Sequence, residues 1–316
     1  MILVQEIALS CRLQLPFLGL STDPKEVIMP FSKFLDPKND IAFKKIFGTE
    51  KNKEILIHFL NDLITFKENQ PIISVSFLKT VQDPETAAKK TSIVDILCKD
   101  EKGNHYIVEM QVAKEKGFEK RAQYYASKAY ISQANSGGAY HDLKEVIFLA
   151  IADFVMFPKK TAYKSDHVIL DKDSHENDLK DFSFTFLELP KFSQDIDHLT
   201  NMTEKWTYFF KHAEQTSIED MQKLVGDDAI MQKAYNQLNA VSWSDEELLT
   251  YDQAEKYEGA YQASMAQKFD EGKIEEKLRI ARNMIQKKYD LSTIADITGL
   301  SLGQIKNLLT EFPKDI

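Results

Sequence analysis

The sequence predicts an α/β fold in which a mixed central sheet is flanked by helices and followed by a mainly α-helical C-terminal region. Three observations predict it. Apolar residues recur at helical spacing over residues 39–66, short β-branched segments follow between residues 72 and 112, and nearly everything after Pro190 has helical periodicity. Strands that follow and precede helices in this way are typical of a sheet covered by helices on its faces.

Composition places the chain among ordinary globular proteins. Of its 316 residues, 43% are hydrophobic and 28% are charged, which excludes a disordered or fibrous class. No apolar run approaches the ~20 residues needed to cross a bilayer, so we expect no membrane partner. The two cysteines, Cys11 and Cys98, form no C-x-x-C pair and suit a reducing compartment, so we expect a cytoplasmic protein.

The first 28 residues are predicted to be an N-terminal extension. Residues 1–20 are apolar enough to suggest a signal peptide, but Glu6 stands where a signal peptide needs positive charge, and Arg12 interrupts the apolar segment. These features argue against export. Met29 is then the expected start of the folded part, and residues 1–28 are upstream sequence or a loosely held arm.

The net charge of −9 is unevenly distributed. Residues 30–150 contain 18 Lys and Arg against 16 Asp and Glu, whereas residues 151–316 contain 20 against 30. A surface that faces phosphates is therefore expected in the first half of the chain.

The predicted elements of the first half begin with helix. Residues 39–66 form one amphipathic stretch that Gly48 divides into two helices, and residues 72–78 after Pro71 form a strand.

Two further strands are predicted at residues 92–99 and 104–112, around a turn at residues 100–103. A helix follows over residues 117–136 and ends at Gly137-Gly138. We expect the helical segment 39–66 on one face of the sheet and the helix 117–136 on the other.

The remaining strands are predicted at residues 146–154, as a buried strand, and at residues 182–187, as an edge strand. Residues 158–181 between them are expected to be a polar excursion. We place a soft boundary near residue 200, so that residues 29–200 form the α/β core and residues 201–316 a helical region.

A long helix is predicted from about residue 245 to residue 288. It carries an apolar stripe of Tyr257, Tyr261, Met265, Phe269, Ile274, Leu278, Ala281 and Ile285. Such a stripe packs against the same chain or against a second copy, so the C-terminal helices are candidates for homo-oligomer contacts.

Two short helices are predicted at the end of the chain, over residues 292–300 and 301–309, with Ser292 and Ser301 as N-caps. Their small core would consist of Ile294, Ile297, Ile305 and Leu308. The pair resembles a helix-turn-helix, but its second helix offers DNA only Gln304, Lys306 and Asn307. A helical hairpin that contacts protein is an equal alternative.

The candidate chemistry lies in the strands around residues 92–112. If residues 100–104 form a five-residue turn, Asp95 lies opposite Glu109 with the two Cβ atoms ~5 Å apart. Strand alternation places Gln111 on the same face as Glu109. Two carboxylates so placed repel each other unless positive charge lies between them.

A hard divalent cation would relieve this repulsion. Mg²⁺ prefers oxygen ligands, so Asp95, Glu109 and the backbone carbonyl of Met110 are the predicted metal ligands. The ion can activate water and stabilise a phosphoryl transition state, and the Gln111 amide can orient water or phosphate. The alternative is a solvated hairpin that happens to carry two acids. The apolar flanks favour the metal site, because unpaired carboxylates are costly in central strands.

Other polar residues allow two interpretations each. Arg121, Tyr125 and Lys128 share one helix face and could contact the DNA backbone, or they could form a solvated basic face. Asp40 near a helix N-terminus could serve catalysis or act as a cap and dipole partner, with Glu54 as a weaker substitute for it. His105 is adjacent to the proposed site and is most often a surface strand residue.

The run N-D-I-A-F-K-K-I-F-G at residues 39–48, S-I-V-D-I-L at residues 92–97 and I-V-E-M-Q at residues 107–111 resemble the Rpn family of recombination-promoting nucleases and transposases. This family belongs to the PD-(D/E)XK nuclease superfamily. The resemblance extends from about residue 30 to the end of the chain. Its further segments are residues 121–125, 138–143, 272–275 and 294–301.

The resemblance implies a restriction-endonuclease-like core and Mg²⁺-dependent cleavage of DNA, in a recombination or mobile-element setting. Asp95 and Glu109 fall on the metal-binding acids, and Asp40 on the acid of the first helix. Gln111 falls where the wider superfamily has lysine, a change that the Rpn family shares. The expected function is therefore a Mg²⁺-dependent DNA endonuclease. A catalytically inactive relative that binds DNA or protein is the first alternative, and a helical oligomerisation protein with an α/β scaffold is the second.

Overall fold

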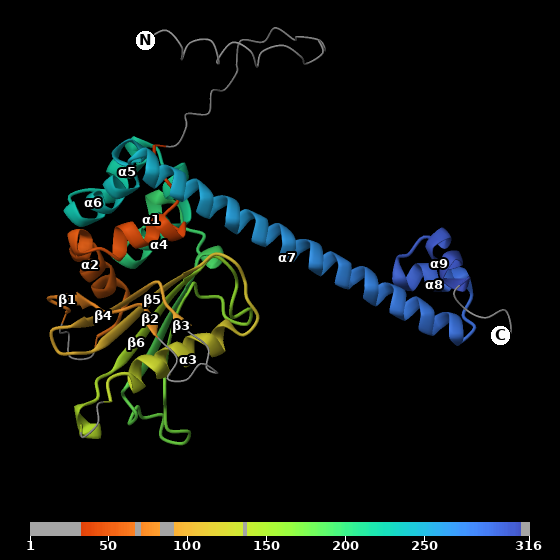
Figure 1. The fold of residues 1–316 in the computed structure, drawn as a ribbon, viewed down its shortest axis with the longest axis horizontal. Helices are drawn as coiled ribbons and strands as arrows, with labels where there is room; N and C mark the ends of the chain where they lie inside the picture. The colour runs from red at the N-terminus through yellow and green to blue at the C-terminus, as the bar shows by residue number, and fades with distance from the viewer. Residues whose placement is uncertain (1–32, 67–70, 83–91, 135–137, 311–316) are drawn as a thin grey trace, which may run out of the picture. The chain divides into compact units, whose positions relative to one another are not determined.

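The computed structural model describes residues 33–66, 71–82, 92–134 and 138–310 (Figure 1). The predicted N-terminal extension, residues 1–28, lies outside the described residues. None of the helices in the described ranges combines the length and the apolar character needed to span a bilayer.

The first helical segment is divided as predicted. Helix α1 (Asp40–Phe47) ends at Gly48, and helix α2 (Lys53–Leu63) follows a short 3₁₀ turn, Glu50–Asn52. Asn39 caps α1, because its side chain accepts a hydrogen bond from the Ile41 amide. At Gly48 a Cβ atom would lie 2.8 Å from the Lys44 carbonyl oxygen, so the close approach that ends α1 requires glycine.

Within the described residues, six strands form one mixed sheet in the order β1-β4-β5-β6-β8-β7. The strands are β1 (Val75–Phe77), β4 (Ile96–Asp100), β5 (His105–Gln111), β6 (Val146–Ala152), β7 (Lys164–Val168) and β8 (Phe182–Glu188). Neighbours pair antiparallel from β1 to β5 and between β7 and β8, whereas β5, β6 and β8 run parallel. This confirms the predicted mixed sheet.

The middle of the sheet is the parallel pair β5 and β6. Every residue of β6, sequence V-I-F-L-A-I-A, is buried, as expected for a parallel strand covered on both faces. Because the two strands run in the same direction, their carboxyl ends meet at one edge. Gln111 pairs with Ala152 there.

Helices cover the two faces of the sheet as predicted (Figure 1). Helices α1 and α2 pack on the face that carries Ile96, Val108 and Leu149. Helix α3 (Phe118–Ile131) packs on the opposite face, where its alanines lie against Ile107 and Phe148. Helix α3 ends at Ile131, earlier than predicted.

Three strand predictions need correction. The predicted strand at residues 92–99 is interrupted at Val94 and Asp95, because its first part, β3 (Ser92–Ile93), pairs with β2 (Val81–Gln82) in a separate small sheet. The polar excursion contains strand β7, which was missed because its sequence K-S-D-H-V has no buried residue. Strand β8 is therefore an inner strand, and β7 forms the edge.

Helices after residue 200 join the same hydrophobic core as the sheet. They are α4 (Met202–His212), α5 (Ile218–Val225) and α6 (Ala229–Leu238). Short 3₁₀ turns precede α4 at Leu189–Lys191 and Ile196–His198, and others follow α4 and α6 at Ala213–Gln215 and Ala240–Ser242. Trp206 and Phe210 of α4 pack with Phe47 and Phe59, so the core continues across the predicted boundary at residue 200.

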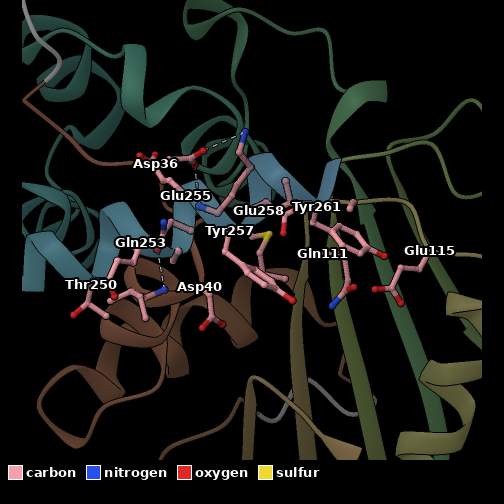
Figure 2. A pocket seen from close by; sticks show the side chains of 17 residues that line it. Asp36, Asp40, Gln111, Glu115, Thr250, Gln253, Glu255, Tyr257, Glu258 and Tyr261 are labelled. Atoms are coloured by element: carbon pink, nitrogen blue, oxygen red, sulfur yellow. Dashed lines mark hydrogen bonds and ion pairs between the residues drawn. The ribbon is translucent and has the colours of Figure 1, made fainter. Parts of the chain in front are cut away.

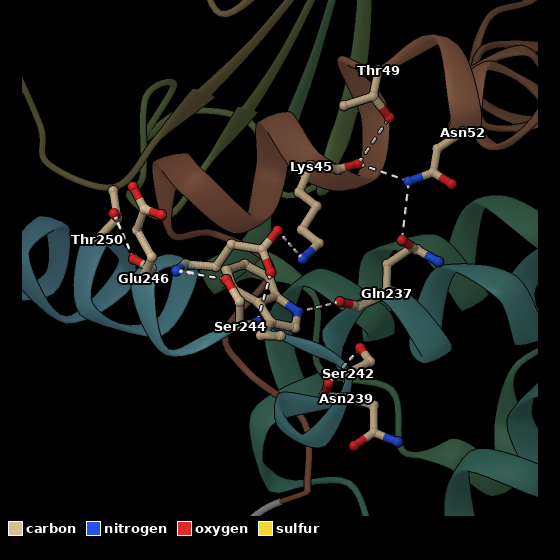
Figure 3. A network of polar contacts seen from close by, with 11 residues as sticks. Lys45, Thr49, Asn52, Gln237, Asn239, Ser242, Ser244, Glu246 and Thr250 are labelled. Atoms are coloured by element: carbon tan, nitrogen blue, oxygen red, sulfur yellow. Dashed lines mark hydrogen bonds and ion pairs between the residues drawn. The ribbon is translucent and has the colours of Figure 1, made fainter.

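The predicted long helix is α7 (Asp245–Gln286), 42 residues. Its start is held by a polar network against α1 and α6 (Figure 3). Ser244 forms a capping box with Glu247, and Glu247 forms an ion pair with Lys45 of α1 at 2.6 Å. One turn later, Tyr251 is buried and its hydroxyl accepts a hydrogen bond from the Asp36 amide.

The last two helices, α8 (Leu291–Thr298) and α9 (Leu302–Leu309), build a separate small core with the end of α7. Ile294, Ile305 and Leu308 are buried as predicted, whereas Ile297 is 62% exposed. Ser301 caps α9 as predicted. The N-cap of α8 is Asp290 rather than Ser292, because the Asp290 carboxylate accepts from the Ser292 and Thr293 amides.

Candidate active site

The hairpin between β4 and β5 sets the positions of the two central acids. Asp100 caps the turn, since one of its carboxylate oxygens accepts from the Lys102 and Asn104 amides, both at 2.9 Å. Gly103 takes the left-handed conformation that this turn needs, with φ +89°. The resulting register pairs Ile96 with Val108, which makes Asp95 the next residue toward Glu109.

Backbone amides donate a hydrogen bond to each of the two acidic side chains, Glu109 and Asp95. The Asp95 amide donates to Glu109 Oε1 at 3.2 Å, and the Met110 amide donates to Asp95 Oδ2 at 2.9 Å. Because the strand is interrupted at Asp95, the amide of Asp95 is not used in a strand ladder and is free to donate to Glu109. The structure therefore brings the two predicted acids together on the face that α3 covers.

Both carboxyl groups have raised pKa values. Burial raises the pKa of Glu109, which is 3% exposed, and the neighbouring Asp95 raises it further. Burial also raises the pKa of Asp95. Two nearby cations, Lys44 and Arg121, lower the pKa of Asp95. Each of them is itself paired with another acid, Lys44 with Asp40 and Arg121 with Glu115. The pair therefore holds protons more strongly than free carboxyls do.

The third predicted residue, Gln111, is held from both sides. Its Nε2 donates to Glu109 Oε2 at 3.0 Å, and its Oε1 accepts from Arg121 Nη2 at 2.5 Å. Arg121 also forms an ion pair with Glu115. These contacts determine which end of the Gln111 amide faces each neighbour.

Arg121 reaches the site because of the way helix α3 begins. Gly117 precedes the helix with φ +86°, and Arg121 follows one turn later, with its guanidinium carbon 4.9 Å from the centre of the Phe118 ring. The predicted basic face of α3 is thus divided. Tyr125 packs partly into the core beneath α3, and Lys128 lies near the ring of Tyr124.

The other sequence candidates lie in different surroundings. Asp40 is the first residue of α1 and forms an ion pair with Lys44 at 2.7 Å. Its charge raises the pKa of Asp95, yet the described residues contain no group of three or more His, Cys, Asp or Glu placed to hold a metal ion. Glu54 pairs with Lys233 instead. His105 begins β5, about 13 Å along the strand from Glu109.

The structure adds Lys38 and Asp153, which the sequence did not indicate. Asp153 follows β6, and its amide donates to the Gln111 carbonyl at 2.8 Å. Its carboxylate forms an ion pair with Lys38 at 3.0 Å, and Asp36 lies on the other side of Lys38 at 3.7 Å. Only the parallel pairing of β5 with β6 places Asp153 beside Gln111, so no local sequence signal reveals it.

A pocket of about 720 Å³ opens at this edge of the sheet (Figure 2). It is lined by Asp40 at the start of α1, by Met110 and Gln111 at the end of β5, and by residues of α7 between Thr250 and Tyr261. A second pocket, of about 480 Å³, lies over the start of α3 and is lined by Arg121. Asp95 and Glu109 lie beside these openings and line neither of them.

A mixed sheet covered by helices on both faces, with an acidic pair at its central strands, defines an α/β protein of the PD-(D/E)XK nuclease type. Comparison with family models agrees. The model described as "PD-(D/E)XK nuclease family transposase" matches residues 37–268, and the model described as "Rpn/YhgA-like nuclease family, C-terminal HTH domain" matches residues 275–310. The chain belongs to the PD-(D/E)XK nuclease family transposases and carries an Rpn/YhgA-like C-terminal domain. Comparisons with curated proteins and with solved structures gave no match.

Proposed function

We propose that this protein is a Mg²⁺-dependent endonuclease that hydrolyses phosphodiester bonds in DNA. The observation that carries the proposal is the pair Asp95 and Glu109, whose carboxylates accept from the neighbouring Met110 and Asp95 amides in surroundings that raise both pKa values. A family that is associated with nuclease and transposase functions supports the same conclusion.

The donor set fits a hard divalent cation. Asp95, Glu109 and the carbonyl of Met110 supply oxygen atoms, which Mg²⁺ prefers. A buried and a half-buried acid, both with raised pKa values, gain from a cation that offsets their charges. Such an ion would supply an activated water and positive charge for the phosphoryl transition state. Asp40 lies at the adjoining pocket, where it would contact this ion through water.

Gln111 and Arg121 would handle the substrate. Arg121 holds the oxygen of the Gln111 amide and Glu109 accepts one of its N–H groups, so the second N–H can keep a constant orientation toward water or the scissile phosphate. The guanidinium itself is the only cationic group among the contacts of Gln111 that the structure describes, and it suits a phosphate oxygen. Tyr125 and Lys128 on the same helix would contact the DNA backbone beyond the site.

The C-terminal domain would bind DNA through helix α9. The exposed side chains of Gln304 and Lys306 lie on that helix, and a second copy could pair through the exposed residues of α7. Because the substrate is DNA and the chain has only two cysteines, we propose that the protein acts in the cytoplasm.

A catalytically inactive relative that binds DNA or protein is the second candidate. It is favoured by the position of Asp40 outside any group of three potential ligands among the described residues. The distinction rests on cleavage, since an inactive relative can bind DNA as well as the nuclease does.

The test is the nicking of a supercoiled plasmid by wild type and Glu109→Ala, with Mg²⁺ and with EDTA. We expect nicking by wild type with Mg²⁺ alone, and none by the variant. Glu54→Ala, which removes an acid that pairs with Lys233 on the protein surface, is the matched control and should nick like wild type. Nicking by Glu109→Ala at the wild-type rate would refute the proposed site.

A further inference from the structure

Helix α7 contributes two tyrosines to the pocket at the end of β5. Tyr257 and Tyr261 are four residues apart and therefore lie on one face of the helix. Figure 2 shows both rings extending from α7 into the pocket, on the side of Gln111. Tyr257 is 75% exposed, so its ring contributes little to any core and is available to a ligand.

The first turns of α7 are fixed on α1, which holds the two tyrosines in place. Lys45 pairs with Glu247, and the Asn39 side chain donates to the carbonyl of Tyr251 at 3.3 Å. Tyr257 lies less than two helical turns after Tyr251. The aromatic wall of the pocket is thus anchored to the first helix of the candidate site through these contacts.

Most of the charged residues that line the pocket are acidic. Asp36, Asp40, Glu115, Glu255 and Glu258 line it, and the one cation among its lining residues, Lys38, is already paired with Asp36 and Asp153. A phosphate group would be repelled by this wall. A nucleobase would not be repelled, because it is neutral. Its π-face can stack on the tyrosine rings, and its exocyclic amino groups can donate hydrogen bonds to carboxylates.

We propose that Tyr257 and Tyr261 form a stacking site for one unpaired nucleobase of the DNA substrate, next to the scissile phosphate. This inference rests on the proposed function for the identity of the substrate. The bases of an intact duplex are stacked on one another and cannot enter the pocket. The site therefore selects single-stranded, gapped or locally opened DNA, or a base turned out of the helix.

Binding of labelled oligonucleotides by the full chain in EDTA tests the proposal without relying on cleavage. Tyr257→Leu keeps the apolar volume and loses the π-face, so single strands should bind about tenfold more weakly, whereas an intact duplex should bind as to wild type. Tyr257→Phe keeps the ring and should bind single strands like wild type. Phe269→Leu removes an exposed ring of α7 outside the pocket and is the matched control.

Cross-linking locates the base directly. Irradiation of a bound single strand that contains 5-iododeoxyuridine should attach it to the tryptic peptide of residues 257–268, which contains both tyrosines. Equal binding by Tyr257→Leu and wild type, or cross-links only outside this peptide, would overturn the stacking site. If the plasmid is not nicked but the Tyr257→Leu loss and the cross-link are found, the nuclease proposal fails and the stacking site stands.

Discussion

Arg121 donates to the side-chain oxygen of Gln111 at 2.5 Å, and this contact joins helix α3 to the end of strand β5. The opposite end of the Gln111 amide donates to Glu109 at 3.0 Å. The orientation of Gln111 therefore depends on a helix that follows it in the chain, and through Gln111 the guanidinium acts on the acidic pair.

The first prediction concerns Arg121 as the residue that positions Gln111. Arg121→Met should slow cleavage by about 100-fold, because the Gln111 amide loses the partner that orients it. Arg121→Lys keeps the charge but cannot reproduce the fork of two donors that serves Gln111 and Glu115, so it should restore only part of the rate. The measurement is kcat and KM for the nicking of supercoiled plasmid.

Lys128→Met, which removes the same charge two turns further along α3, is the control for Arg121. It should change KM more than kcat, since Lys128 would touch only the DNA backbone. A wild-type kcat for both Arg121 variants would show that Gln111 needs no support from α3.

The second prediction concerns stability and pH. Asp95 has a pKa above its ordinary value of 3.8 in the folded protein, so the folded state binds the proton more tightly than the unfolded state does. Ionisation therefore costs stability, and wild type should lose this stability as pH rises from about 4 through the folded-state pKa of Asp95, which is about 6. Asp95→Asn has no proton to lose, and its amide oxygen can still accept from the Met110 amide.

Thermal unfolding in EDTA measures this difference. The melting temperature of Asp95→Asn should match wild type near pH 4 and exceed it by about 2–4 °C near pH 8. Glu54→Gln, at an exposed acid outside the site, should show no such gain. A gain that is the same at both pH values would mean that the charge of Asp95 is not the cause.

The third prediction concerns metal binding. Because Mg²⁺ binds the ionised carboxylates, its affinity for wild type should rise with pH, and binding should release protons. Asp95→Asn should lose both Mg²⁺ binding and cleavage. Gln111→Ala should bind Mg²⁺ nearly as wild type does and cleave more slowly, since its amide acts on water or phosphate. Calorimetric titration of the three proteins with Mg²⁺ measures the affinity and the proton release. Unchanged affinity and activity in Asp95→Asn would refute the two-carboxylate site.

The fourth prediction concerns the C-terminal domain. Leu278 and Ala281 of α7 pack with α8 and α9, so a truncation at residue 290 would expose their apolar surface. Removal of residues 275–316 avoids this and should leave the α/β core folded. The truncated protein should bind duplex DNA more weakly in an anisotropy titration, yet still nick plasmid at high concentration. Complete loss of cleavage by the folded truncation would show that the site requires this domain.

Local patterns predicted the elements that depend on neighbouring residues. The division at Gly48, the β4–β5 hairpin, the buried strand β6 and the length of α7 follow from periodicity and turn chemistry. Strand β7 was missed because an edge strand with few apolar residues has no alternation to detect. Ile297 was wrongly predicted to be in the core, because it lies on the exposed face of α8, and a helix of eight residues buries few positions.

By itself the sequence determined that Asp95 and Glu109 meet, because a five-residue turn sets the register of an antiparallel hairpin and the two acids lie within fifteen positions of each other. Only the tertiary structure decided what surrounds them. Arg121 reaches Gln111 through the docking of α3, Asp153 lies beside Gln111 through the parallel pairing of β6, and Tyr257 faces the pocket through the packing of α7 on α1. These contacts join distant segments, and the burial of apolar side chains across the whole fold, rather than any local pattern, brings such segments together.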